Sequence, residues 1–282
     1  MRPPLNAPVL ALPVDPAAVR DIIVAAAATA ILPRFKALAA GDIRQKSGPN
    51  DFVTEADLHC QAILTERLRE LLPGSAVVGE EGAGTGAEAC AAIAAADWCW
   101  IIDPIDGTHN FVHSRSNFVV MVALAHRGET VGGWIHNPLT GETHHAAAGQ
   151  GAWRKDERLE VAKPAPLKDM TGVLYIGAKR APALHARIKA MHEQLGPQSF
   201  LRSAGSEYVG LAAGRIHYAV FTLLLPWDHA PGMLLFHEAG GHAAYWDGEP
   251  YRPSAARPMP VLLAPDAKTW RELREFFEAP AP

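Results

Sequence analysis

Apolar residues recur along the chain with the spacing of helices in some segments and of strands in others. A helical pattern covers 16–39 and follows Asp15 and Pro16, which are a favourable N-cap and first helical residue. Comparable patterns predict further helices at 54–72, 182–195, 204–214, 228–239 and 266–278. Helices are therefore expected in both halves of the chain.

Short apolar runs bounded by turn residues predict strands between these helices. The run "FVVMVALAHRGETVGGWIHNP" (118–138) predicts two strands around a turn at Arg127-Gly128. Other strands are predicted in "SAVVGEEG", "WCWII", "TGETHHAAAGQGAW", "IHYAVFTLLL", "HAAYW" and "MPVLLA". The segment "GAGTGAEA" (82–89) predicts a flexible link instead. This mixture of helices and hairpins favours an α+β fold of stacked layers.

The order of these elements also suggests a domain organisation. Residues 1–14 are rich in proline and predict an irregular N-terminal arm. Residues 15–282 are expected to form one unit that can divide into two subdomains, at about 15–150 and 151–282. We expect the first part to carry the principal chemistry and the second to select the substrate.

Composition and charge exclude some classes of function. Lys and Arg number 26 and Asp and Glu 30, which gives a formal charge of −4. Nucleic-acid binding is not expected, because it normally needs a basic excess. The apolar run at 22–32 is too short to span a bilayer, and the acids Asp15 and Asp21 precede it, unlike a signal peptide. We expect a cytoplasmic protein without membrane contact and with free thiols at Cys60, Cys90 and Cys99.

The segment "DPIDGT" (103–108) concentrates charge where a buried strand ends. Pro104 removes an N–H and predicts a sharp turn out of the strand, after which Asp103 and Asp106 can point to the same side. Two close carboxylates resist joint ionisation unless a cation lies between them. Oxygen ligands in such a site favour Mg²⁺ or Mn²⁺. A capped turn without a metal is the simpler alternative.

The residues after Asp106 suggest a partner for that metal. Gly107 allows the backbone to come close to a ligand. The amides of Gly107, Thr108 and His109 could then form the start of a helix, which suits a phosphate group. The segment therefore predicts half of a metal site that faces a phosphate.

Three other acidic segments lie beside structural breaks: "NDFVTEAD" (50–57), "GEEG" (79–82) and "PWDHA" (226–230). Each has a structural alternative. Thr54 and Asp57 match a helix capping box, Glu80 could lie in a solvated loop, and Asp228 could be an N-cap.

Taken together, four motifs resemble those of the inositol monophosphatase family, in the Mg²⁺-dependent, lithium-sensitive phosphatase superfamily. They are "DFVTEAD", "VVGEEG", "WIIDPIDGTHNF" and "PWDHAPGMLLFHEAGG", and they span about residues 50 to 241. The resemblance implies a layered αβαβα sandwich, a homodimer and hydrolysis of a small soluble phosphate ester. It also implies two or three Mg²⁺ ions per site.

The resemblance also implies individual roles. The metal ligands would be Glu80, Asp103, the Ile105 carbonyl, Asp106 and Asp228. Asp51, Glu80 and Thr108 would hold and activate the attacking water, so that no phosphoenzyme forms. The substrate would contact Asp106, Gly107, Thr108, His109, Gly205, Ser206, Glu207 and Asp228.

The chain departs from the inositol-preferring pattern in the region that sets substrate choice. Phe221 stands where an acidic residue is typical, and Glu207 and Tyr208 stand where small residues are typical. A phenyl ring cannot accept hydrogen bonds from sugar-like hydroxyls. Glu207 could replace that acceptor, face a cationic substrate, or be an ordinary helix residue. Histidinol phosphate, fructose bisphosphate and 3′-phosphorylated nucleotides remain alternative substrates, and a non-catalytic metal-binding regulator remains an alternative of another class.

Overall fold

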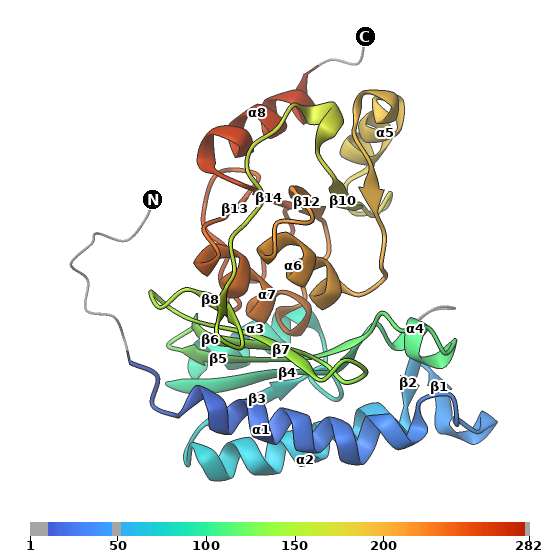
Figure 1. Cartoon of the computed structure of the whole chain (residues 1–282), viewed down its shortest axis with the longest axis vertical. Helices are drawn as coiled ribbons and strands as arrows, with labels where there is room; N and C mark the ends of the chain where they lie inside the picture. Colours follow the sequence, from blue (N-terminus) through green and yellow to red (C-terminus); the bar gives the residue numbers. More distant parts are fainter. Residues whose placement is uncertain (1–10, 47–51, 280–282) are drawn as a thin grey trace.

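The computed structural model describes residues 11–46 and 52–279 and arranges them in five layers. Figure 1 shows, from bottom to top, a helical layer, a first sheet, a second helical layer, a second sheet and a third helical layer. The described part of the chain is therefore an αβαβα sandwich, and the predicted fold class is confirmed.

The first sheet has seven strands in the order β3-β4-β5-β6-β7-β8-β9. Its strands are β3 (Ala76–Gly79), β4 (Trp98–Asp106), β5 (Val119–His126), β6 (Glu129–Asn137), β7 (Glu142–Ala147), β8 (Ala152–Arg154) and β9 (Glu157–Arg158). All neighbours are antiparallel except β3 and β4. The predicted turn between β5 and β6 is confirmed, because Arg127 and Gly128 both have positive φ, as a two-residue type I′ turn requires.

The second sheet has five strands in the order β11-β10-β12-β14-β13. Its strands are β10 (Gly172–Tyr175), β11 (Gln198–Ser199), β12 (Tyr218–Phe221), β13 (His242–Tyr245) and β14 (Val261–Ala264). β10 runs parallel to β11 and β12, and the other pairs are antiparallel. A separate pair, β1 (Ile43–Gln45) and β2 (Phe52–Thr54), lies beside the first sheet. The second sheet thus begins at Gly172, and an independent subdomain boundary near 150 stays a prediction.

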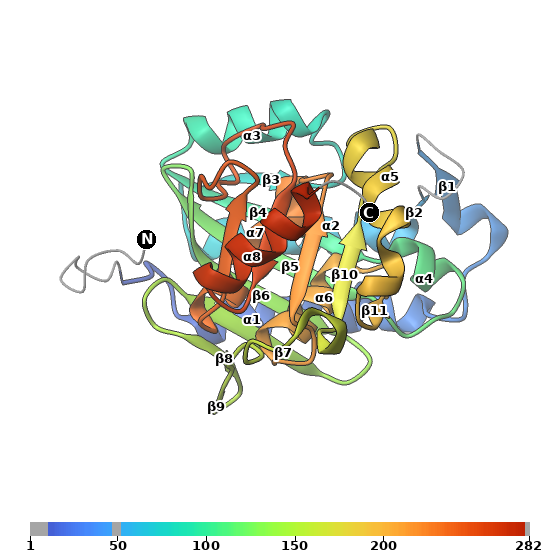
Figure 2. The same ribbon diagram turned by 90° about the horizontal axis from the view of Figure 1, so that it is seen from above.

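Helices fill the three remaining layers. The bottom layer is α1 (Pro16–Ala26) and α2 (Glu55–Leu71), and the middle layer is α3 (Gly86–Ala95), α6 (Ala204–Ala212) and α7 (Pro226–Glu238). α5 (Pro182–Ala190) and α8 (Ala267–Glu278) cover the five-stranded sheet, as Figure 2 shows from above. A short helix, α4 (Thr108–Val112), follows β4 directly.

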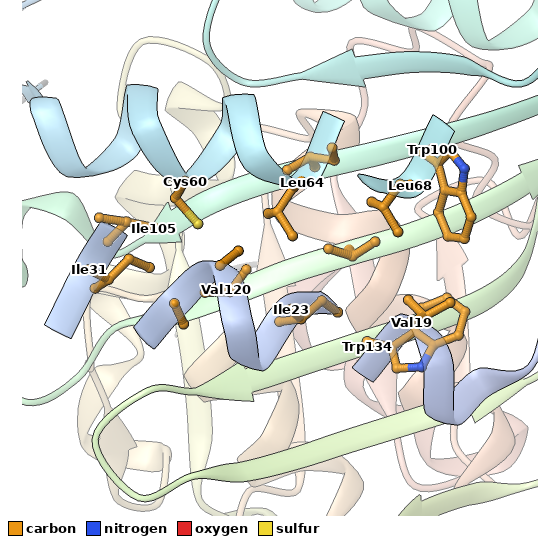
Figure 3. Close-up of a cluster of buried hydrophobic side chains, with 14 of the residues drawn as sticks. Val19, Ile23, Ile31, Cys60, Leu64, Leu68, Trp100, Ile105, Val120 and Trp134 are labelled. Atoms are coloured by element: carbon orange, nitrogen blue, oxygen red, sulfur yellow. The ribbon is translucent and has the colours of Figure 1, made fainter. Parts of the chain in front are cut away.

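The core under the first sheet joins α1 and α2 to the inward face of the strands. Figure 3 shows Ile23 of α1, Leu64 of α2 and Val120 of β5 meeting there, together with Trp100 and Trp134. All five residues are at most 1% exposed. Burial of each large aliphatic side chain contributes roughly 1.5–3 kcal/mol. This core holds the strands that carry the acidic segments.

Some predicted boundaries are wrong. The first helix ends before 39, because the chain passes through a π turn at Ala27–Ile31 and a 3-10 turn at Leu32–Arg34 that contains Pro33. The segment 82–89 is not only a link, because α3 begins at Gly86. Its start is fixed by a capping box in which Thr85 and Glu88 bond reciprocally. The parallel strands β10 and β11 were not predicted.

The helix over Pro16–Arg34 has 19 residues and a mean hydropathy of 1.5, so by length and composition alone it could cross a membrane. Its apolar face packs in the core described above, through residues such as Val19, Ile23 and Ile31. The three cysteines are buried and free, as predicted.

Candidate active site

The ends of β3 and β4 bring two of the acidic segments together. The strands are parallel, with Gly79 opposite Ile102, and the Glu80 N–H donates to the Ile102 carbonyl (2.9 Å). Glu80 therefore lies beside the end of β4, where Asp103 follows. The register of β4 against β5 shifts between Asp103 and Asp106, across the segment where proline cannot donate to the ladder. The predicted sharp turn at Pro104 is thus a break in pairing, and the chain turns only at Gly107.

Asp103 is 2% exposed and lies among other acids. One carboxylate oxygen accepts a hydrogen bond from the Ile105 N–H (3.0 Å). Burial raises the pKa of Asp103 well above its usual range, and the charges of Glu80, Asp106 and Asp228 raise it further. Acids from three separate segments thus act on one carboxyl, which is the arrangement that a bound cation would relieve.

Asp106 joins β4 to the start of α6. Its carboxylate accepts hydrogen bonds from the Ser203 hydroxyl (2.5 Å), the Ala204 N–H (3.0 Å) and the Gly205 N–H (2.8 Å). Burial raises the pKa of Asp106, and these donors oppose the rise. A carboxylate has about four lone-pair sites, so roughly one remains for another ligand. Asp106 therefore links the first sheet to the middle helical layer as well as contributing to the acid cluster.

Gly107 is required by both its conformation and its surroundings. It has φ of 93° and is the N-cap of α4. A Cβ at this position would lie 2.8 Å from the Asn117 carbonyl oxygen and 3.3 Å from that of Arg202. The Asn110 side chain also donates to these two carbonyls, at 2.6 and 3.2 Å. The start of α4 therefore fits closely against the loop that leads to Ser203.

Lys46 provides the positive charge of the cluster. Its ammonium donates to Glu80 (2.8 Å) and Glu81 (2.6 Å). Burial alone would lower the pKa of Lys46, but the two glutamates outweigh it, and the pKa is raised. All three side chains are at most 25% exposed, so solvent screens these ion pairs less than it would at the open surface.

Asp228 lies in the first turn of α7, at the third helical residue, whereas the N-cap is Leu225. Burial raises the pKa of Asp228 well above its usual range, and the charges of Glu80 and Asp106 raise it further. The next residue, His229, stabilises this turn, because its ring bonds the Leu223 carbonyl and the Tyr208 hydroxyl, both at 2.8 Å. The structural alternative, an N-cap role for Asp228, is therefore contradicted, and the pKa of the residue responds to the other acids instead.

Thr108 connects the cluster to α2. Its hydroxyl lies 2.9 Å from the Ile105 carbonyl and 3.3 Å from Asp57. Asp57 also forms the predicted capping box with Thr54. Burial raises the pKa of Asp57 to about 7, and the charge of Glu80 contributes. Asp57 thus serves the helix start and the acid cluster together.

The substrate-contact predictions divide into two groups. Gly205 and Ser206 begin α6, where the Gly205 N–H binds Asp106 and the Ser206 hydroxyl lies 2.7 Å from that of Ser203. His109 is partly exposed, and its ring lies 3.1 Å from the Arg202 guanidinium. Glu207, by contrast, is 0% exposed, and its carboxylate accepts hydrogen bonds from the Ser199 hydroxyl and the Leu201 N–H. Direct contact between Glu207 and a substrate is therefore contradicted, because its carboxylate faces the interior.

The donor set has the chemistry of a Mg²⁺ site. Glu80, Asp103, Asp106 and Asp228 offer hard oxygen ligands. Burial raises the pKa of Asp103 and of Asp228, and the neighbouring acids raise both further. Among residues 11–46 and 52–279, no three acidic, histidine or cysteine side chains already lie arranged as a metal-binding group. The ammonium of Lys46 instead balances part of the charge.

Sequence reasoning missed three residues of this cluster. Lys46 precedes the first acidic motif, Asp57 was interpreted only as a cap, and Ser203 lies in "RSAGSEYVG" without a charge to mark it. The predicted Asp51 lies outside the described residues. A lysine a few residues ahead of an acidic motif was the one signal that could have been used.

Comparison with known proteins shows the family of the chain. The model of the inositol monophosphatase family matches residues 15–274. Inositol-1-monophosphatase of Bacillus subtilis is 35% identical over 74% of this chain and 78% of its own. Fructose-1,6-bisphosphatase/inositol-1-monophosphatase of Thermotoga maritima is 32% identical over 74% and 77%. The Nus factor SuhB of Vibrio cholerae is 31% identical over 69% and 72%. The solved structure of a Thermotoga maritima IMPase has a TM-score of 0.77 at 26% identity, and the match covers 92% of this chain and 94% of that one.

Proposed function

The chain belongs to the inositol monophosphatase family, and from this premise we propose that it is a Mg²⁺-dependent phosphomonoesterase that acts on a small soluble phosphate ester. The observation that carries the proposal is the convergence of Glu80, Asp103, Asp106 and Asp228 from three segments, with electrostatic effects on one another. Folding alone gives no benefit from such repulsion. Function therefore accounts for the cluster better than stability does.

Each residue of the cluster has a proposed task. Glu80, Asp103, the Ile105 carbonyl, Asp106 and Asp228 would hold the metal. Bound Mg²⁺ would lower the pKa of a water molecule and neutralise charge on the phosphoryl group. Mn²⁺ could serve as well. Asp103 and Ile105 are pre-arranged, since the Ile105 N–H orients the Asp103 carboxylate.

The chain's own groups would place the water and the phosphate. The Thr108 hydroxyl lies against the Ile105 carbonyl and can orient a water with Glu80, and we assign Asp51 to the same task by its place in the motif. The amides of Gly107 and Thr108 would receive phosphoryl oxygens. The Lys46 ammonium, which pairs with Glu80, would move away when a divalent cation neutralises that carboxylate in its place.

The remaining properties follow from family membership. We propose hydrolysis by water without a phosphoenzyme, a homodimer, a cytoplasmic location and inhibition by lithium. Inositol monophosphate is the default substrate. The name of the Thermotoga relative supports fructose bisphosphate as an alternative.

The test is a phosphate-release assay over a panel of esters, with Mg²⁺ or with EDTA. The panel contains inositol 1-phosphate, histidinol phosphate, fructose 1,6-bisphosphate and adenosine 3′,5′-bisphosphate. We expect turnover of at least one ester with Mg²⁺ and none with EDTA. Absence of turnover of every ester, with metal present, would end the proposal.

Asp103→Asn gives the matched test of the metal site. We expect it to lose turnover by at least about a thousandfold and to lose the rise in melting temperature that Mg²⁺ gives the wild type. In EDTA its melting temperature should not fall, because the substitution removes one buried repelling charge. Asp97→Asn is the control, since Asp97 is exposed and pairs with Arg127. Equal Mg²⁺ responses in the two variants would contradict the assignment.

The name of the SuhB relative supports a second candidate, a regulator that binds another macromolecule. The acids of the cluster would then be retained without turnover. The same ester panel separates the two functions, because a regulator of this kind would bind Mg²⁺ and release no phosphate.

A further inference from the structure

A rim of basic side chains borders the proposed active site. It consists of His109 of α4, the C-cap residue His113, Arg115 and Arg202. The Arg202 guanidinium lies 3.1 Å from the nearer ring nitrogen of His109, and the His109 and His113 rings stack at 4.3 Å. Burial lowers the pKa of His109, and His113, Arg202 and Arg115 all lower it further. The basic groups of the rim thus repel one another.

Within the described part of the chain, the two arginines of the rim, Arg115 and Arg202, have no acidic partner. Both arginines are exposed. An anion is therefore the ligand that the rim suits.

The buried Glu207 fixes the loop that carries Arg202. Its carboxylate accepts hydrogen bonds from the Leu201 N–H (2.6 Å), the Ser199 hydroxyl (2.8 Å) and the Tyr175 hydroxyl (3.4 Å). The Tyr175 oxygen in turn accepts from the Arg202 N–H (2.7 Å). Arg202 has φ of 55°, a left-handed conformation that these bonds hold. Glu207 is thus a positioning residue for Arg202.

Aromatic rings also pack against the loop that carries Arg202. Phe200 is 60% exposed and stacks on Tyr175 at 5.1 Å, and Tyr175 stacks on Phe221 at 5.7 Å. The Arg202 guanidinium lies over the Phe200 ring, 5.5 Å from its centre. Stacking on a ring face leaves the N–H groups at the guanidinium edge available to an anion.

The rim lies next to the proposed phosphate position. Arg202 directly precedes Ser203, which binds Asp106, and His109 directly follows Thr108. The side chain of Asn110 ties the loop to α4 through the Leu201 carbonyl (2.8 Å). A substrate whose phosphate meets Gly107 and Thr108 would extend its leaving group past this rim.

We propose that Arg202, with His109 beside it, binds a second anionic group on the leaving-group side of the substrate. The preferred esters would then carry a phosphate or carboxylate besides the phosphate that is hydrolysed. This inference rests on the proposed phosphatase function. It agrees with Phe221, which is buried in the aromatic stack and offers no acceptor to the hydroxyls of a neutral polyol.

The experiment compares three series of esters with spacers of two to six carbons. They are α,ω-alkanediol bisphosphates, ω-carboxyalkyl phosphates and ω-hydroxyalkyl phosphates. At the best spacer length, kcat/KM should favour at least one anionic series over the hydroxyl series by about 30-fold, as a charge-assisted contact typically gives. The two anionic series show whether a phosphate or a carboxylate is preferred.

Arg202→Met should reduce this ratio to about threefold or less, mainly through a higher KM for the anionic esters. Arg202→Lys should keep part of the ratio, because lysine retains the positive charge but lacks the planar guanidinium group. Arg271→Met, at an exposed position of α8, is the control and should keep the wild-type ratio. An unchanged ratio in Arg202→Met, or no preference in the wild type, would overturn the inference.

Binding measurements keep this test separate from the phosphatase proposal. If no ester is turned over, the phosphatase proposal fails. Calorimetric titration of the bisphosphates into wild type and Arg202→Met still tests the contact. A loss of affinity of about 30-fold in the variant supports the anion site, and equal affinities refute it.

Discussion

Replacement of Gly107 by alanine tests whether the close fit at the start of α4 assembles the site. A left-handed conformation costs an alanine about 1–2 kcal/mol relative to glycine. The new Cβ would also lie 2.8 Å from the Asn117 carbonyl oxygen, which belongs to the backbone and cannot rotate away. Such overpacking costs roughly 1–3 kcal/mol more. We therefore expect Gly107→Ala to lower the free energy of unfolding by about 2–5 kcal/mol.

Gly248→Ala separates the two contributions. Gly248 has φ of 91°, close to the 93° of Gly107, but its Cβ would meet nothing within 4 Å. This control should lose only about 1–2 kcal/mol. Urea unfolding of both variants gives the difference, which measures the contact with Asn117 and the neighbouring Arg202 carbonyl.

Activity provides the second measurement. Displacement of the Arg202 carbonyl would move Ser203 away from Asp106, so kcat/KM of Gly107→Ala should fall at least tenfold while Gly248→Ala keeps the wild-type value. Equal stabilities of the two variants would refute the steric reasoning. Full activity of a destabilised Gly107→Ala would show that the loop does not assemble the site.

Two further changes test the packing and the buried histidines. Gly232→Ala should lose roughly 3 kcal/mol or more in urea unfolding, because its Cβ would lie 2.1 Å from the buried ring of Tyr208. A stability within about 1 kcal/mol of wild type would contradict this. Burial lowers the pKa of His136 and of His144 from 6.5 to about 4. As the pH falls, these histidines are therefore protonated in the unfolded chain before they are protonated in the folded protein. Stability is therefore complete above pH 6.5 and is lost as the pH falls towards 4, by roughly 3 kcal/mol per histidine. Urea unfolding across this range should show a shallower decline for His136→Gln, and an equally steep decline would show that His136 does not titrate on unfolding.

Local sequence signals predicted the first layers of the fold well. Asp15 and Pro16 start α1, and the positive φ values of Arg127 and Gly128 confirm the hairpin turn. Each signal depends on a few neighbouring residues, so a single sequence contains it. The residues of α3 are mostly small and show little alternation of polar and apolar positions, and only the Thr85 capping box marks the start of the helix.

The long-range parts could not be read in the same way. Asp106 and Ser203 are 97 positions apart, and nothing near either residue indicates the other. The family motifs predicted which acids would meet, but not that Lys46 would balance Glu80 and Glu81. The interior position of Glu207 also depends on β10 and β11, whose short parallel strands carry little periodic pattern.

The three donors on the Asp106 carboxylate determine which experiments on this cluster can be interpreted. A substitution there releases the hydroxyl of Ser203 and two amides of α6 at the same moment as it withdraws an oxygen from any ion. An inactive Asp106 variant could thus have lost either the contact that holds α6 or a ligand of the ion, and activity alone would not distinguish the two. Asp103, whose one protein donor is the nearby Ile105 amide among the described residues, offers the cleaner probe of catalysis.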